Sequence, residues 1–261
     1  MSTHTSFSPG RGLALGLEGH VATLVFSRPP LNFFDAELIK DLADALQYLD
    51  DLPQCRVVIL QAEGKVFCAG ADFSGDDQHD PQFPRRVYKS AVRLFRNRKP
   101  LICVVEGAAI GGGLGLALVA DFRVTSEKAR FSANFNRLGI HQGFGISVTM
   151  PRLVGPQMAS LLIATGRRID GREAVRIGLA DVLAEPGTER HKARELAEEI
   201  AASAPGAVMS SRETLRMGLA DAVDRIIDRE ASEQEWQIVS ADFAEGTRAM
   251  AERRTPVFTG Q

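Results

Sequence analysis

Three consecutive glycines, Gly111–Gly113, stand between the apolar run Leu101–Val105 and a second apolar stretch that is typical of a helix. Glycines leave the peptide N–H groups of such a turn uncovered by side chains, and the helix that begins there adds the positive end of its dipole. The segment is therefore suited to bind an oxygen atom that carries negative charge.

A second glycine turn, Phe67–Asp72, follows the strand-like run Arg56–Ala62. If both turns lie at the same end of neighbouring strands, one N–H group from each can point at a single carbonyl oxygen. This arrangement is an oxyanion hole made of main chain alone. Glycine clusters also occur in plain tight turns and in close helix packing, so only the pair of turns supports the hypothesis.

The polar segment Phe131–Gly145 precedes another apolar run and is a candidate for the lining of a pocket. Histidine side chains titrate near neutral pH and act as acids or bases, which makes His141, with Gln142 beside it, a candidate proton carrier. A lone histidine in a polar loop is also often a solvated side chain. Asn134 and Asn136 are suited to bond a substrate carboxylate or carbonyl, or to cap turns.

The chain has 261 residues, of which 44% are hydrophobic, and this is enough for one α/β domain with a large core and a helical appendage. The formal net charge of −2 and a pI near 6.2 provide no basic face. A nucleic-acid partner is therefore not expected.

No run of the sequence approaches the roughly 18 apolar residues that cross a bilayer, so we expect no membrane partner. Residues 1–10 lack the apolar core of a signal peptide and are expected to form a flexible tail of a cytoplasmic protein. The chain has three cysteines, which is an odd number, and they are widely spaced: Cys55, Cys68 and Cys103. They are interpreted as buried thiols in a reducing compartment, in preference to disulfides or a metal site.

The first third of the chain predicts a β–α–β unit. Leu13–Leu17 and Val21–Phe26 are typical of a β-hairpin, and Asp35 is a candidate N-cap for a helix that ends before Pro53. The run Arg56–Ala62 is short and β-branched, as in a buried strand.

Strand, turn and helix patterns then repeat, which favours a largely parallel sheet with helices packed outside. The pattern predicts a mobile loop at Ser74–Pro84, a helix at Val87–Arg98 and strands at Leu101–Val105 and Phe122–Val124. Asp121 is expected to tie strand ends together. The last third is predicted to be helical, with helices at Met158–Thr165, Gly171–Ile177, Glu189–Ala202, Ala207–Met217 and Ala220–Gly246.

Several motifs occur in the order that is typical of the crotonase superfamily, also called the enoyl-CoA hydratase/isomerase superfamily, and the chain resembles this family from Val21 to Phe258. The resemblance implies an α/β fold, a crotonase-like spiral of ββα units over residues 11–200, followed by a C-terminal helical trimerisation subdomain over residues 201–261. It also implies a homotrimer or homohexamer. The motifs are Ser27–Pro29 with Asn32, Phe67–Asp72, Gly107 with Gly111–Gly113, Ala120–Asp121, Leu153–Gly155, Thr165–Gly166, Ala174 and Gly178–Leu179.

The resemblance further implies an acyl-CoA thioester as substrate, with the carbonyl held by the N–H groups of Ala71 and Gly112. Coenzyme A enters as part of the substrate, so no separate cofactor and no metal are expected. Phe258 and the basic pair Arg253–Arg254 are placed near the nucleotide by analogy, although a basic helix end that complements the dipole is an alternative. The implied substrate-binding residues are Arg28, Leu31, Ala69, Gly70, Asp72, Gly111, Phe135, Gln142 and Phe258.

The sequence departs from the hydratase pattern at the two positions where hydratases of the family have catalytic glutamates. Gly115 stands at the first and Phe135 at the second, and neither side chain can move a proton. Ordinary two-glutamate hydration is therefore not expected, and His141 is the candidate replacement. The alternatives are decarboxylation of a malonyl- or glutaconyl-type thioester in the same hole, and acyl-CoA binding without catalysis.

Overall fold

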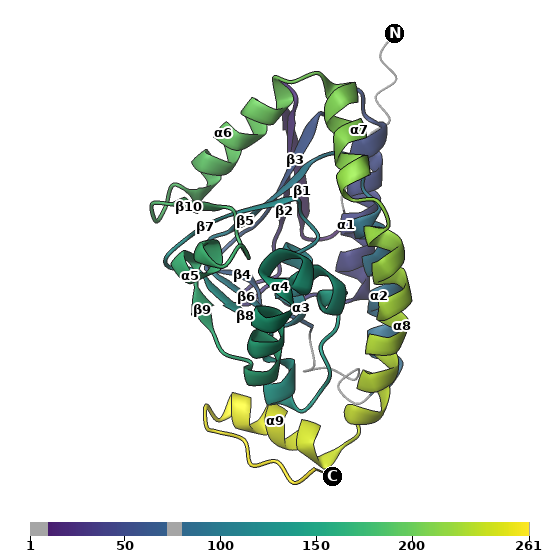
Figure 1. Cartoon of the computed structure of the whole chain (residues 1–261), viewed down its shortest axis with the longest axis vertical. Helices are drawn as coiled ribbons and strands as arrows, with labels where there is room; N and C mark the ends of the chain where they lie inside the picture. The colour runs from purple at the N-terminus through teal and green to yellow at the C-terminus, as the bar shows by residue number, and fades with distance from the viewer. Residues whose placement is uncertain (1–9, 72–79, 261) are drawn as a thin grey trace.

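The computed structural model describes residues 10–71 and 80–260, and this part of the chain forms two β-sheets with helices around them (Figure 1). The larger sheet has the order β1-β2-β3-β5-β7-β10, and the smaller has the order β4-β6-β8-β9. The larger comprises β1 Leu13–Glu18, β2 Val21–Phe26, β3 Val57–Ala62, β5 Leu101–Val105, β7 Phe122–Ser126 and β10 Val182–Ala184. The smaller comprises β4 Val66–Cys68, β6 Ala108–Ile110, β8 Arg130–Ser132 and β9 Ile169–Asp170.

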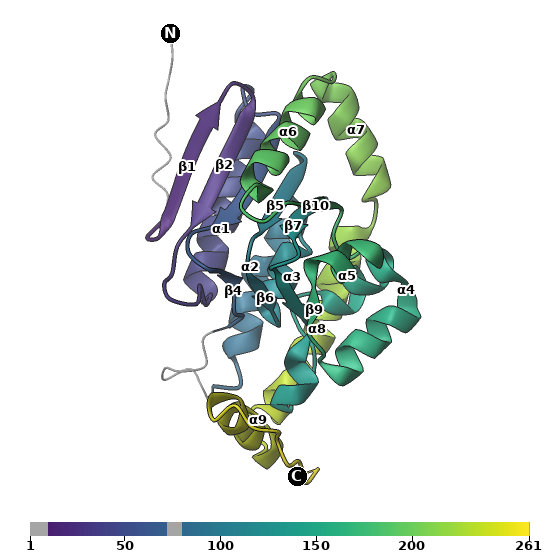
Figure 2. The same cartoon turned by 90° about the vertical axis from the view of Figure 1, so that its left-hand side faces the viewer.

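Neighbouring strands of the larger sheet run parallel, apart from the antiparallel β1–β2 hairpin, which lies at one edge of the molecule in Figure 2. Strand β3 is buried along its whole length because helices cover both faces. Val57 and Ile59 pack with helix α6 (Glu189–Ala201), whereas Val58 and Leu60 join the core shared with helix α1 (Ala36–Asp51). Figure 1 shows α6 and α1 on opposite sides of this sheet.

The smaller sheet corrects the prediction of which strands the glycine turns follow. The sequence assigned them to the ends of the long strands, but the short strands β4 and β6 intervene, and the turns follow these instead. The chain therefore repeats strand, strand and helix, as in β3–β4–α2 (α2, Phe83–Phe95) and β5–β6–α3 (α3, Gly112–Ala117). This repetition confirms the spiral of ββα units.

The helices after β8 are α4 Ile146–Thr165, α5 Gly171–Arg176, α6, α7 Pro205–Leu215, α8 Leu219–Gln237 and α9 Ala241–Ala251. Helix α4 begins twelve residues before the predicted Met158 and is kinked at Gly155, which precedes Pro156. The prediction of a single helix at Ala220–Gly246 was wrong. It is two helices, because Ser240 caps α9 by accepting a hydrogen bond from the Phe243 N–H.

Several local predictions are confirmed. Asp35 caps α1 by accepting from the Leu38 N–H, and all three cysteines are buried and free. Burial raises the pKa of the Cys68 thiol to about 12, so this thiol stays protonated. Helix α2 begins at Phe83, inside the predicted loop Ser74–Pro84, while the rest of that loop up to residue 79 and tail residues 1–9 lie outside the described residues. Among the described residues, no helix is long and apolar enough to span a membrane.

Candidate active site

The two glycine turns lie against each other at the carboxyl ends of paired strands. Strands β4 and β6 are parallel neighbours, with Cys68 opposite Ala109. A Cβ atom placed on Gly70 would lie 3.1 Å from the carbonyl oxygen of Ile110 and 3.6 Å from the amide nitrogen of Gly112. Gly70 also has φ +103°, a conformation that favours glycine. A position of both turns at the same end of neighbouring strands is the condition for the predicted oxyanion hole, and the parallel pairing of β4 and β6 meets this condition.

The main-chain amides of Ala71 and Gly112 are available to a ligand. Gly112 is the first residue of α3, so its N–H has no partner within the helix. None of the residues at 10–71 or 80–260 accepts a hydrogen bond from either amide. The neighbouring groups are already paired, since Gly70 accepts from the Phe34 N–H at 3.0 Å and Ala69 donates to the carbonyl of Leu31 at 3.1 Å.

Three phenylalanine rings cover the start of α3, and we call Phe34, Phe135 and Phe144 the aromatic cover. A Cβ atom on Gly112 would lie 2.5 Å from Cζ of Phe34, and one on Gly115 would lie 2.6 Å from Cβ of Phe144. Both glycines are therefore required by close contact with an aromatic side chain. Position 115, the predicted equivalent of the first hydratase glutamate, has no room for a side chain.

Position 135, the predicted equivalent of the second glutamate, is equally apolar. Phe135, in the short 3₁₀ helix η2 (Asn134–Leu138), is buried, and its Cζ lies 3.8 Å from the Cβ position of Gly111. Beside it, Asn134 is also buried, and within the described part of the chain its Oδ1 has no hydrogen-bond partner. The Nδ2 atom of Asn134 lies 3.8 Å from the sulfur of Met250 in α9.

Phe144 has an unusual backbone conformation for a bulky residue, with φ +63°. Tertiary packing holds it there, because its ring lies 5.3 Å from the Phe34 ring and 6.4 Å from the Tyr88 ring, centroid to centroid. Phe34 in turn forms an isolated β-bridge with Ala71. The sequence reasoning missed Phe34 and Phe144. The position of Phe144 between Gly143 and Gly145 was the available signal.

His141 is half-buried, and its Nδ1 lies 2.7 Å from the carbonyl oxygen of Gln142. A carbonyl only accepts hydrogen bonds, so Nδ1 carries the proton in the neutral ring and Nε2 keeps its lone pair. In this tautomer Nε2 is the ring atom that can accept a proton. Phe144, three residues further on, contacts Gly115, so the loop that contains His141 lies against α3.

The loop of residues 28–32, which contains Pro29 and Pro30 and which we call the proline loop, carries the predicted substrate-binding residues Arg28 and Leu31. Arg28 donates from Nη1 to Asp35 at 2.9 Å, and its N–H donates to Oδ1 of Asn32 at 2.7 Å. Asn32 holds the loop against the core by donating to the carbonyls of Glu63 and Val66, both at 2.7 Å. Beside the loop is a cavity of about 520 Å³ that extends to Phe34 of the aromatic cover. It is lined by Arg11, Gly12, Ser27, Arg28, Pro29, Pro30, Phe33, Phe34 and Asp35.

The C-terminal residues lie apart from the turns, beyond α9 at the lower end of Figure 1. Phe258 is exposed. Arg254 is paired with Glu245 at 2.5 Å and with Glu252 at 2.6 Å, so its guanidinium is engaged by acidic groups at the end of α9. Asp72 lies outside the described residues.

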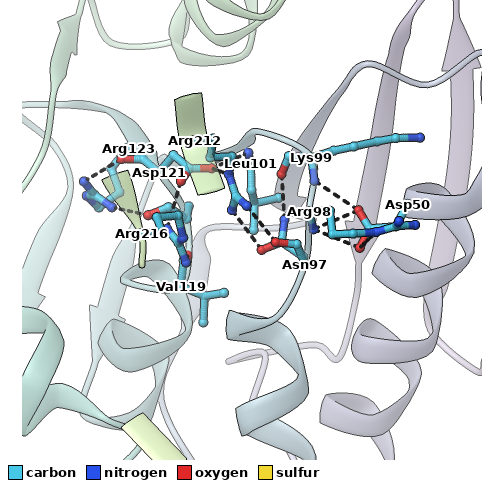
Figure 3. Close-up of polar contacts among 11 residues, drawn as sticks. Asp50, Asn97, Arg98, Lys99, Leu101, Val119, Asp121, Arg123, Arg212 and Arg216 are labelled. Carbon is cyan, nitrogen blue, oxygen red and sulfur yellow. Dashed lines mark hydrogen bonds and ion pairs between the residues drawn. The ribbon is translucent and has the colours of Figure 1, made fainter. Parts of the chain in front are cut away.

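Asp121 has the structural role that the sequence predicted (Figure 3). Its carboxylate accepts from the Leu101 N–H at 2.8 Å and pairs with Arg212 at 2.7 Å and Arg216 at 2.8 Å. The two arginines come from α7 and from the turn after it, so this cluster joins the C-terminal helices to the sheet. A cavity of about 660 Å³ lies beside the cluster, and none of its lining residues belongs to the glycine turns.

The fold and this site define an α/β protein of ββα units in which the amides of two adjoining glycine turns have no partner among the described residues. Residues 16–261 match the family model described as enoyl-CoA hydratase/isomerase. The chain belongs to the enoyl-CoA hydratase/isomerase family.

Known relatives are similar to this chain over almost its whole length. A Thermus thermophilus protein with the provisional name enoyl-CoA hydratase is 35% identical over 253 residues, which cover 92% of this chain and 98% of the relative. Carnitinyl-CoA dehydratase of Proteus mirabilis is 30% identical over 96% of this chain and 99% of its own. The crystal structure of an enoyl-CoA hydratase/isomerase from Pseudoalteromonas atlantica superposes with a TM-score of 0.84 at 31% identity, covering 95% of this chain and all of that one.

Proposed function

We propose that this protein is an enzyme that acts on an acyl-CoA thioester and stabilises an enolate-type oxygen with the N–H groups of Ala71 and Gly112. The main support is the contact between the two glycine turns, with Gly112 N 3.6 Å from the Cβ position of Gly70 and both amides unpaired within the described chain. Family membership adds that relatives are named for reactions of CoA thioesters.

A thioester carbonyl between two amides becomes more polarised as negative charge develops on its oxygen. This happens when a proton or carbon dioxide leaves the adjacent carbon and its bonding electron pair stays behind, or when a nucleophile adds to a conjugated double bond. Donors aimed at the developing charge stabilise the transition state more than the ground state, which is the requirement for catalysis. Loss of one such donor typically costs about 100- to 1000-fold in rate.

In the proposed reaction the proton is moved by His141 through Nε2. The glutamate positions are occupied by Gly115 and Phe135, and the aromatic cover fills the space around them. His141 is therefore the titratable side chain on the loop packed against α3, and its Nδ1 is already committed to the carbonyl of Gln142.

The proposed binding site of the coenzyme A moiety is the 520 Å³ cavity beside the proline loop, with Arg28 near the phosphates. The cavity reaches Phe34, which contacts both glycine turns, so a ligand placed there extends toward the amides. The remaining substrate-binding assignments, Leu31, Ala69, Gly70, Asp72, Gly111, Phe135, Gln142 and Phe258, stay predictions.

Decarboxylation of a malonyl-type thioester is the second candidate. Loss of carbon dioxide itself generates the enolate, so this reaction needs one proton donor and no second carboxylate. The replacement of both glutamate positions by apolar groups favours it over hydration.

The test is turnover of a thioester panel that contains a short trans-2-enoyl-CoA and malonyl-CoA, with His141→Ala as the matched variant. We expect turnover by the wild type and at least a tenfold loss of kcat in the variant. Hydration at normal hydratase rates that does not depend on His141 would contradict the proposed chemistry. Tight acyl-CoA binding without turnover would identify a non-catalytic binder, and failure to bind any CoA ester would overturn both functions.

A further inference from the structure

Helix α8 holds the loop that contains His141 through three polar side chains on one face. Glu230, Gln234 and Gln237 are spaced by four and three residues, which places them on the same side of the helix. Their partners are main-chain groups between His141 and Ser147, more than 80 residues earlier in the chain.

Both main-chain polar groups of His141 are bound by α8. The His141 N–H donates to Oε1 of Gln237 at 2.5 Å, and the His141 carbonyl accepts from Nε2 of Gln234 at 2.6 Å. A peptide N–H only donates and a carbonyl only accepts, so these partners determine which way each glutamine amide is turned. The His141 peptide is therefore held from both sides.

The Oε1 atom of Gln234 and the carboxylate of Glu230 also have partners. Oε1 of Gln234 accepts from the hydroxyl of Tyr88 at 2.8 Å. The carboxylate of Glu230, which is fully buried, accepts from the N–H of Gly145 at 2.8 Å and from that of Ser147 at 3.1 Å. These bonds hold the loop at both ends, at His141 and at the start of α4.

Apolar packing alone already places α8 against this loop. Val223 of α8 is fully buried, and its Cγ1 lies 2.9 Å from the Cβ position of Gly145. Buried polar side chains add little net stability compared with apolar ones, and they impose a desolvation cost unless every partner is in place. What they add here is a defined position for one peptide, that of His141.

We propose that Gln234 and Gln237, supported by Glu230, are positioning residues that hold the His141 peptide so that its imidazole reaches the substrate. The inference rests on the proposed function, because it gives His141 the proton transfer. A displacement of about 1 Å of a catalytic group can cost on the order of 100-fold in rate. Residues of the C-terminal helical region thus contribute to catalysis without touching the substrate.

The experiment compares Gln237→Ala, which removes the acceptor for the His141 N–H, with Gln237→Glu, which keeps an oxygen there. Glu235→Gln is the control on the same helix, since Glu235 pairs with Arg85 at the surface. We expect Gln237→Ala to lower kcat at least tenfold with KM within about threefold. Gln237→Glu should recover most of that loss, and Glu235→Gln should match the wild type.

A double-mutant cycle separates positioning from general loss of stability. In a His141→Ala background, Gln237→Ala should have no further effect on kcat, because the group that it positions is gone. Additive losses would overturn the inference. A wild-type kcat in His141→Ala itself would instead overturn the proposed role of His141.

Hydrogen exchange of the segment around His141 gives a second measurement that does not depend on activity. The His141 amide should exchange faster in Gln237→Ala than in the wild type and in Glu235→Gln. If the exchange is unchanged, or if kcat stays at the wild-type value in Gln237→Ala while His141→Ala is inactive, Gln237 does not position His141.

Discussion

Gly115 lies directly under Phe144, whose side chain takes the space that a residue with a Cβ atom would need. At the scale of single residues, the predicted replacement of a glutamate by Gly115 is therefore a change of volume as well as of chemistry. The Phe34 ring likewise takes the space that a Cβ atom at Gly112 would need. Phe34 also contacts the other glycine turn through its β-bridge to Ala71. The glycines that expose the amides and the aromatic side chains that cover them belong to one packed unit.

Gly115→Ala should lower the free energy of unfolding by about 1–3 kcal/mol, the typical cost of adding a methyl group to a filled core. The new Cβ would lie 2.6 Å from Cβ of Phe144. Gly206→Ala in α7 is the control, because a Cβ there meets no atom within 4 Å. Urea denaturation of both variants checks the prediction. Equal free energies of unfolding in the two variants would show that Phe144 does not crowd position 115.

Removal of the Gly112 amide tests the oxyanion hole directly. Phe34→Leu removes the Cζ atom that crowds position 112, and in this background Gly112→Ala keeps the N–H whereas Gly112→Pro removes it. Proline is accepted at the first position of a helix, and Gly111 has no Cβ to clash with the ring. We expect kcat to be about 100- to 1000-fold lower with proline than with alanine. Equal kcat in two variants of matched melting temperature would exclude Gly112 as a donor.

At the scale of elements, the C-terminal helices are joined to the sheet and to the candidate site by separate polar clusters. Arg212 and Arg216 meet Asp121 beside β5 and β7, where all three side chains are mostly buried (Figure 3). Glu230, Gln234 and Gln237 of α8 meet the His141 loop. A helix that a sequence pattern assigns only to a helical appendage is therefore also part of the scaffold of the site.

The buried Glu230 predicts a pH dependence of stability. Burial raises the pKa of its carboxyl from 4.5 to about 7, although the N–H groups of Gly145 and Ser147 oppose this. Since the pKa of Glu230 is higher in the folded state than in the unfolded state, the folded state binds the proton more tightly. The protonated Glu230 carboxyl therefore contributes fully to the free energy of unfolding below about pH 4.5. This contribution is lost as the pH rises through about 7.

Glu230→Gln cannot ionise, so the wild type should lose about 3 kcal/mol of stability relative to this variant between about pH 4.5 and pH 8. Urea denaturation of both proteins across this range measures the difference. Parallel stability curves would show that Glu230 does not titrate in this range.

At the scale of the whole molecule, α7 has little cover compared with the other helices of the described chain. None of its residues is buried, and Leu215 at its end is 78% exposed, with Met217 close by at 76%. Exposed large apolar side chains in one place are typical of an interface. This exposure supports the predicted homotrimer or homohexamer.

We expect light scattering to give three or six times the 28.3 kDa of one chain. The double variant Leu215→Glu and Met217→Glu should shift the mass toward one chain, because two charges cannot be buried at an apolar contact without a partner. Arg172→Glu, at an exposed position of α5, serves as the surface control. A wild-type protein with the mass of a single chain would refute the assembly.

Much of the molecule follows from local sequence. The hairpin β1–β2, the cap at Asp35, the buried strand β3 and the two glycine turns depend on side-chain types within a few residues, and their positions were predicted to within a residue or two. The positions with Gly115 and Phe135 were recognised from the family motif alone. The short strands β4 and β6 were not predicted, because three residues are too few to show a period.

What the tertiary structure decided depends on contacts between distant segments. Phe34 reaches Gly112 across nearly 80 residues, and Gln237 reaches His141 across 96. Periodicity and propensity describe which residues lie on one face of an element, whereas they contain no information about which other element that face will meet. The sequence therefore determined the turns that present the amides, and only the fold determined the aromatic side chains over them and the helix that holds His141.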